Sequence, residues 1–150
     1  MKHLSFIAVL FVVLICAVPA QPGGANQAVR FQAVDIVIDS REAPLAAYQL
    51  EFLIKIGNAR VVGVEGGEHP AFKEAPSHDP KAIQQERVII AAFNTSAADR
   101  LPKGRTRVAT IHLQVIGEQT PECMVQLQTA ATAEGRKISA KATFEERKAQ

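Results

Sequence analysis

The chain has 150 residues, of which 17 are basic and 15 are acidic, and this length is enough for about one domain. Hydrophobic residues make up 47% and charged residues 21%, which excludes wholesale disorder and a coiled coil. No basic run is long enough to follow a nucleic-acid backbone, so we expect no nucleic-acid partner.

The first twenty residues have the three parts of a secretory signal peptide. Lys2 gives a positive start, Leu4–Val18 contains no charged residue, and Val18-Pro19-Ala20 resembles a cleavage site. The apolar run is shorter than the roughly 20 residues that span a bilayer. We predict a signal peptide over 1–20 and a secreted product (periplasmic, extracellular or on the cell surface) with no membrane attachment after cleavage. An uncleaved N-terminal anchor is the alternative.

Residues 21–27 (QPGGANQ) are predicted to form a flexible lead-in, and beyond them apolar and polar residues alternate. Successive side chains of a strand point to opposite faces, so alternation predicts strands with one buried side. The side chains predicted to face inward include Val34, Ile36, Ile38, Tyr48, Leu50, Phe52, Ile54, Ile56, Ala109, Ile111, Leu113, Val115, Cys123, Val125, Leu127, Ile138, Ala140, Ala142 and Phe144.

Several local features are predicted from breaks in this pattern. A short strand over Ala28–Phe31 has the opposite phase, which predicts a bulge or a break near residues 32–33. Leu53 and Val108 are expected on the solvent side of their strands. Short helices are expected over 81–87 and 96–101, and a possible edge strand over 71–73.

The run Val88–Phe93 (VIIAAF) is apolar on both faces, as is Val61–Val64. A strand in a sandwich has one face toward solvent, yet the run 88–93 has no polar side chain to place on that face. Either the Pro-rich loop Gly66–Pro80 covers this face, or the face belongs to an exposed apolar patch that marks an interface.

About eight short strands separated by turn signals predict an all-β fold: an antiparallel two-sheet β-sandwich of the jelly-roll type with about eight or nine strands. We expect this sandwich over residues 28–145 and a C-terminal tail over 146–150.

The order of the segments resembles cohesin domains. The similar segments are AVDIVID (33–39), LAAYQLEFLIKI (45–56), ARVVGVEGG (59–67), RVIIAAFN (87–94) and GRTRVATIHLQV (104–115). The resemblance covers residues 28–145. It implies a nine-stranded, cohesin-like jelly roll, related in fold to some cellulose-binding modules, that is not an enzyme.

The resemblance also implies a function and a binding surface. Cohesins bind dockerin modules through one outer sheet face, so a protein partner, dockerin-like or other, is expected on the solvent sides of the third, sixth and eighth strands. The partner-binding residues predicted there are Gln49, Glu51, Leu53, Ala91, Phe93, Thr110, His112 and Gln114.

A carbohydrate (polysaccharide) binding module of the related fold is the alternative function. Sugar platforms usually need exposed Trp or Tyr rings. The chain has no Trp, and its single Tyr, Tyr48, is in phase with buried residues. Stacking on a sugar would fall to Phe72 or Phe93, which leaves a soluble glycan as the expected ligand of this alternative.

No set of residues forms a catalytic constellation, and no cofactor or metal is expected. His69, His78 and Asp79 share one loop but lack metal-ligand spacing, so they are interpreted as polar loop residues. Asp35 and Asp39 lie roughly 13 Å apart on one strand face, too far for a glycosidase pair, and are expected to be solvated.

The remaining features of interest are one cysteine and one glycosylation pattern. Cys123 points inward and is interpreted as a buried small residue rather than a nucleophile. Asn94-Thr95-Ser96 matches the N-glycosylation pattern and is expected in a loop after a strand.

Overall fold

The computed structural model describes residues 27–147. The predicted signal peptide, all but the last residue of the lead-in, and the last three residues of the predicted tail lie outside the described residues. No helix within residues 27–147 has the length and hydropathy needed to cross a bilayer.

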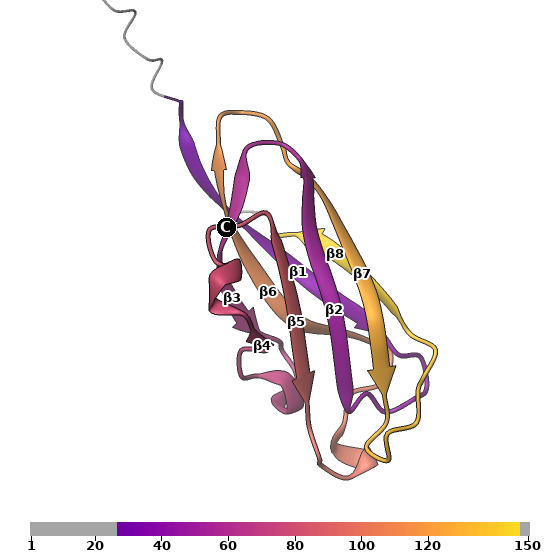
Figure 1. Cartoon of the computed structure of the whole chain (residues 1–150). Helices are drawn as coiled ribbons and strands as arrows, with labels where there is room; N and C mark the ends of the chain where they lie inside the picture. The colour runs from indigo at the N-terminus through magenta and orange to yellow at the C-terminus, as the bar shows by residue number, and fades with distance from the viewer. Residues whose placement is uncertain (1–26, 148–150) are drawn as a thin grey trace, which may run out of the picture.

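Eight strands and three single-turn 3-10 helices form this part of the chain (Figure 1). The strands are β1 (Val29–Asp39), β2 (Ala47–Ile56), β3 (Ala59–Gly66), β4 (Ser77–His78), β5 (Arg87–Phe93), β6 (Arg105–Ile116), β7 (Glu122–Ala131) and β8 (Lys141–Glu146). The 3-10 helices are η1 (Pro70–Phe72), η2 (Pro80–Ala82) and η3 (Ala98–Arg100).

The strands form two four-stranded antiparallel sheets, in the orders β3-β6-β1-β8 and β4-β5-β2-β7. We call them the β6 sheet and the β5 sheet. The pairs are nested, since β1 pairs with β8, β2 with β7, β3 with β6 and β4 with β5. This nesting is the jelly-roll arrangement, and the predicted all-β sandwich is confirmed.

Alternating residues of both sheets fill the space between them. The side chains of Ile36, Leu50, Phe52 and Ile111 are fully buried there, as the period of two predicts. The Tyr48 ring meets Phe72 edge to face, with centroids 5.3 Å apart. Its hydroxyl donates a hydrogen bond to the Val108 carbonyl at 3.2 Å, which satisfies the one polar atom that this side chain brings into the core.

The prediction that Val108 faces solvent is wrong, because β6 has a bulge at this residue. Ile36 pairs with Ala109, whereas Val37 pairs with Arg107, so Val108 is an extra residue in β6. Both Val108 and Ala109 therefore point into the core and are fully buried. The expected bulge or break near residues 32–33 is absent, since β1 is one continuous strand and its pairing with β6 shifts register only between Ile36 and Val37.

Other boundaries also differ from the sequence prediction. Ile56 lies at the end of β2 and is 51% exposed instead of buried. The helices expected over 81–87 and 96–101 shrink to the single turns η2 and η3, and residues 71–73 fall largely in η1 while the edge strand is β4. The last strand begins at Lys141, and Lys137 makes only an isolated bridge to Ala131.

The Pro-rich loop over 66–80 closes one end of the sandwich and does not cover the outer face of β5. Its Phe72 is 2% exposed and packs in the core, and β4 adds to the edge of β5 through Ser77 and Ala91. The Asn94 side-chain amide, which follows β5 as expected, donates to the Ala71 carbonyl at 3.1 Å. Phe93 is left 79% exposed, so the loop does not cover this end of the strand, while Ile89 and Ala91 are half-buried.

Gly67 fixes where this loop lies against β6. A Cβ atom at Gly67 would lie 2.2 Å from the Arg107 carbonyl oxygen and 2.8 Å from the Val108 Cα. Only glycine therefore lets the two backbones approach this closely.

We expect Gly67→Ala to lower the free energy of unfolding by about 1–3 kcal/mol, because the added methyl group overlaps backbone atoms that cannot rotate away. Gly63→Ala is the matched control, since a Cβ there would meet the His112 ring at an ordinary 3.6 Å. Urea unfolding measures both variants, and equal stabilities of the two would contradict the close approach at Gly67.

Candidate functional site

The structure divides the eight predicted partner-binding residues between two faces that look away from each other. Five of them, Gln49, Glu51, Leu53, Ala91 and Phe93, belong to β2 and β5 of the β5 sheet. The other three, Thr110, His112 and Gln114, belong to β6 of the β6 sheet. The expectation that all eight share one surface is wrong, because β6 pairs with β1 and β3 rather than with β2 or β5.

The outer face of the β5 sheet carries an apolar strip along β5. We call Ile89, Ala91 and Phe93 the β5 strip; their neighbours Val88 and Ile90 point into the core. Ile89 and Ala91 are half-buried, and Phe93 is the most exposed large hydrophobic side chain among the described residues. The strand β2 runs beside the whole strip, whereas the two-residue β4 pairs with it only at Ala91.

Polar side chains of β2 and β7 border the β5 strip. Glu51 pairs in register with Ile89 and forms an ion pair with Arg87. Gln49, in register with Ala91, donates a hydrogen bond to Gln128 of β7. The face thus has the apolar β5 strip and, beside it, polar side chains that already contact one another.

Thr110 is not available to a partner. It is fully buried, and its hydroxyl donates to Asp35 Oδ1 at 2.7 Å while it accepts from Arg107 Nη1 and Arg147 Nη2, each at 3.0 Å. Arg147 also donates to both carboxylate oxygens of Asp35, at 2.6 and 3.1 Å. These contacts tie β1, β6 and the residue after β8 together, so the cluster is structural.

The same contacts alter the acidity of Asp35, which was expected to be merely solvated. Burial raises the pKa of Asp35, but hydrogen bonds from Arg147 and Thr110, together with the charges of Arg147 and Arg107, outweigh burial and hold the pKa below its ordinary value. The bond to Asp35 in turn raises the pKa of Arg147.

His112 and Gln114 lie on the outer face of the β6 sheet, opposite the β5 strip. The His112 Nε2 atom is 3.1 Å from Glu65 Oε1, within ion-pair distance but without hydrogen-bond alignment. Gln114 pairs with Phe31 of β1 and Arg60 of β3.

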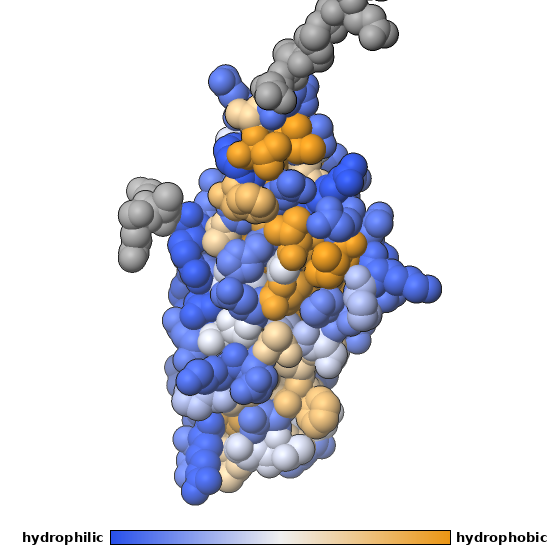
Figure 2. Space-filling view, turned by 90° about the vertical axis from the view of Figure 1, so that its left-hand side faces the viewer, coloured by the Kyte–Doolittle hydropathy of each residue, from blue (hydrophilic) through white to orange (hydrophobic). Residues whose placement is uncertain are grey.

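Further apolar surface lies at the end of the molecule where β1 begins. Val29 is 52% exposed, Phe31 74% and Ile56 51%. Figure 2 shows strongly hydrophobic side chains gathered toward this end, which is uppermost in the view.

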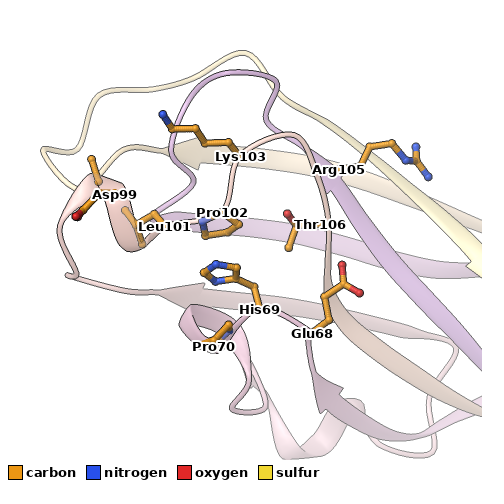
Figure 3. A pocket seen from close by; sticks show the side chains of 10 residues that line it. Glu68, His69, Pro70, Asp99, Leu101, Pro102, Lys103, Arg105 and Thr106 are labelled. Carbon is orange, nitrogen blue, oxygen red and sulfur yellow. The ribbon is translucent and has the colours of Figure 1, made fainter.

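A hollow of about 610 Å³ opens at the other end of the sandwich, and we call it the end pocket (Figure 3). The loop after β3 forms one wall, and the segment from η3 to the start of β6 forms the other. Its polar lining residues are Glu68, His69, Asp99, Lys103, Arg105 and Thr106. Sequence reasoning named only His69 among them, because the two walls are about thirty residues apart and no motif links them.

The remaining predicted groups have local partners. His69 Nδ1 accepts from the Ala71 backbone N–H at 3.2 Å, and His78 Nδ1 lies 3.1 Å from the Pro76 carbonyl. Asp79 accepts from the Lys81 N–H, and Asp39 from the Arg41 N–H. Across residues 27–147, no three His, Cys, Asp or Glu side chains converge as metal ligands would.

The exposed aromatic rings do not form a sugar-stacking platform. Phe93 lies on the outer face of the β5 sheet and Phe31 on that of the β6 sheet. Tyr48 and Phe72 are each 2% exposed. A row of coplanar rings, which the polysaccharide alternative would use, is therefore absent from the described surface.

Comparison with known proteins gives no match: no family model fits the chain, and no curated protein or solved structure is significantly similar to it.

We expect Asp35→Asn to destabilise the protein by about 1 kcal/mol at neutral pH, because the charge-assisted bonds from Arg147 are lost. Since the folded-state pKa of Asp35 is lowered, its contribution is complete above the ordinary value of 3.8 and disappears as the pH falls through the lowered value. The difference in the free energy of unfolding between wild type and variant should therefore disappear on acidification. Urea unfolding at a series of pH values measures this difference. A gap that stays constant through the acid range would contradict this assignment; Arg147→Gln should show the same convergence.

Cys123 should react slowly. Burial, and secondarily the Glu146 charge, raises the pKa of its thiol to about 11, from an ordinary value of 9.0. At mildly alkaline pH the thiolate fraction is then about a hundredfold lower than for an exposed thiol. Iodoacetamide should label the folded chain far more slowly than the urea-unfolded chain, and equal rates would show that the thiol is activated after all.

Proposed function

We propose that this chain is a secreted, non-catalytic binding module that recognises a protein partner through the outer face of the β5 sheet. One observation supports the proposal above all others: Phe93 is 79% exposed at the end of an apolar strip. Removing a phenylalanine side chain from water is worth about 1.5–3 kcal/mol. A partner that covers Phe93 would recover this free energy, which the isolated domain forgoes.

The surroundings of Phe93 support a protein ligand. Interface centres are enriched in aromatic residues and bordered by polar groups that exclude water. Here Phe93 and Ala91 provide the apolar part, while Gln49 and Glu51 of the neighbouring strand provide the polar border. Leu53, on the same strand, adds a half-buried apolar side chain. The ion pair and hydrogen bond within that border hold the side chains in place before any partner binds.

As the resemblance to cohesins implies, an outer sheet face would bind a dockerin-like or other protein. The proposed binding surface contains fewer residues than the one predicted from the sequence. Thr110, His112 and Gln114 are left out, because they belong to the other sheet. The secretory part of the proposal continues to rest on the signal-peptide pattern of residues 1–20. Among the described residues of the β5 face, a polysaccharide would find one exposed ring, Phe93. Binding to a polysaccharide is therefore one of the outcomes that the experiment distinguishes.

The experiment compares two charge substitutions on opposite faces. Wild type, Phe93→Asp and the control Phe31→Asp, each immobilised as the secreted chain, are exposed to the secretome of the source organism. The two phenylalanines are similarly exposed, so a general effect of removing surface phenylalanine affects both variants alike. We expect one protein to be retained by wild type and Phe31→Asp, and to bind Phe93→Asp at least about tenfold more weakly.

Other results would contradict the proposal. Equal retention by all three chains would place the interface elsewhere. Binding to a soluble or insoluble glycan without any co-purifying protein would favour the alternative function. Loss of the retained protein on calcium chelation would support a partner of the dockerin type, whose modules bind as calcium-loaded forms.

A further inference from the structure

The end pocket has walls that are fixed before any ligand binds. On one side, the Gly67 N–H donates to the Phe72 carbonyl at 2.7 Å, and the Glu68 N–H donates to the Arg107 carbonyl at 3.0 Å. These hydrogen bonds hold the wall so close to β6 that a Cβ at Gly67 would overlap the Arg107 carbonyl. A wall so constrained does not lose conformational entropy when a ligand arrives.

The opposite wall is held equally firmly. Leu45 N–H donates to the Pro102 carbonyl at 2.9 Å, and Gly104 N–H to the Arg41 carbonyl at 2.6 Å. Leu101 is 5% exposed, which anchors the segment between η3 and β6 in the core. The hollow between the two walls is therefore preformed, and its volume lies within the range typical of small-molecule sites, about 300–1,000 Å³.

Two neutral hydrogen-bond donors are directed to this hollow. Because His69 Nδ1 accepts a backbone N–H, the neutral imidazole carries its proton on Nε2. Thr106 is 6% exposed, and its hydroxyl has no hydrogen-bond partner among the described residues. Thr106 pairs with the inward-facing Ile38 of β1 and lines the pocket, so its hydroxyl can donate to a group bound there.

The charges around the pocket are balanced but not all paired. Arg105 forms an ion pair with Glu145, and Glu68 accepts the Arg107 backbone N–H. Asp99 and Lys103 line the same hollow with opposite charges, yet within residues 27–147 neither forms an ion pair. Figure 3 shows Asp99 and Lys103 on the η3 side of the pocket and His69 on the other wall, with Arg105 pointing away from them.

We propose that the end pocket binds a small zwitterion of the α-amino acid class. Its carboxylate would accept hydrogen bonds from His69 Nε2, the Thr106 hydroxyl and the Lys103 ammonium group, and its ammonium group would pair with Asp99. A simple anion fits less well, since the carboxylates of Asp99 and Glu68 line the same hollow. The proposal is independent of the protein-binding face, because none of these residues belongs to the β5 strip.

The test uses the free amino acids themselves as probes. The secreted chain is titrated with each of the common L-amino acids at millimolar concentration, with backbone amide chemical shifts as the readout. We expect shifts at residues 67–71 and 98–106. The best ligand is then compared with its deaminated and its decarboxylated analogue, and both should bind at least about tenfold more weakly, because each loses a charge-assisted bond.

Two variants test the residues directly. Lys103→Gln and Asp99→Asn should each weaken binding by about tenfold, whereas Lys55→Gln, an exposed lysine outside the pocket, should leave it unchanged. No shift with any amino acid would overturn the proposal, as would shifts confined to another surface. Equal binding of the deaminated analogue would also overturn it, since the pocket would then recognise a carboxylate alone.

Discussion

Every feature of this domain depends on one constraint, the burial of one side of each long strand between two sheets. Tyr48 of β2 and Ile111 of β6 both point into this interior. They enter it from opposite sides, because β2 and β6 lie in different sheets. The same constraint leaves the edge strands, the outward faces of the sheets and the ends where loops cross from one sheet to the other as surfaces for recognition. The β5 strip lies on an outward face and the end pocket at an end.

Local periodicity was enough to predict the sandwich and most of its core, because a period of two specifies which side of a strand is buried. It could not specify which sheet a strand joins, since that depends on pairing between residues far apart in sequence. For this reason the sequence predicts Thr110 and Phe93 on one surface, whereas they belong to different sheets and Thr110 is buried. Periodicity also fails at a bulge, where the extra residue Val108 reverses the phase that the sequence displays.

The candidate sites show the same division between local and long-range information. Phe93 could be foreseen, because a strand without polar residues on its wet side is visible in the sequence. The cluster of Asp35, Thr110 and Arg147 could not, since 112 residues separate Asp35 from the arginine that lowers its pKa. An alternating polar residue was interpreted as solvated, whereas partners from two other segments bury Thr110 completely. The end pocket escaped detection for an equivalent reason, as its walls meet only after folding.

A short stretch of chain brings the exposed face and the end pocket close together without merging them. Phe93 ends β5, and Asn94 follows it with an amide that donates to the Ala71 carbonyl, two residues after His69. Four residues further on, η3 begins one wall of the pocket. The hydrogen bond from Asn94 thus joins the loop on one side of the pocket to the segment that leaves the β5 strip. Because this link is made by backbone and amide groups, it leaves the Phe93 ring free for an apolar surface and the charged side chains free for a small polar ligand.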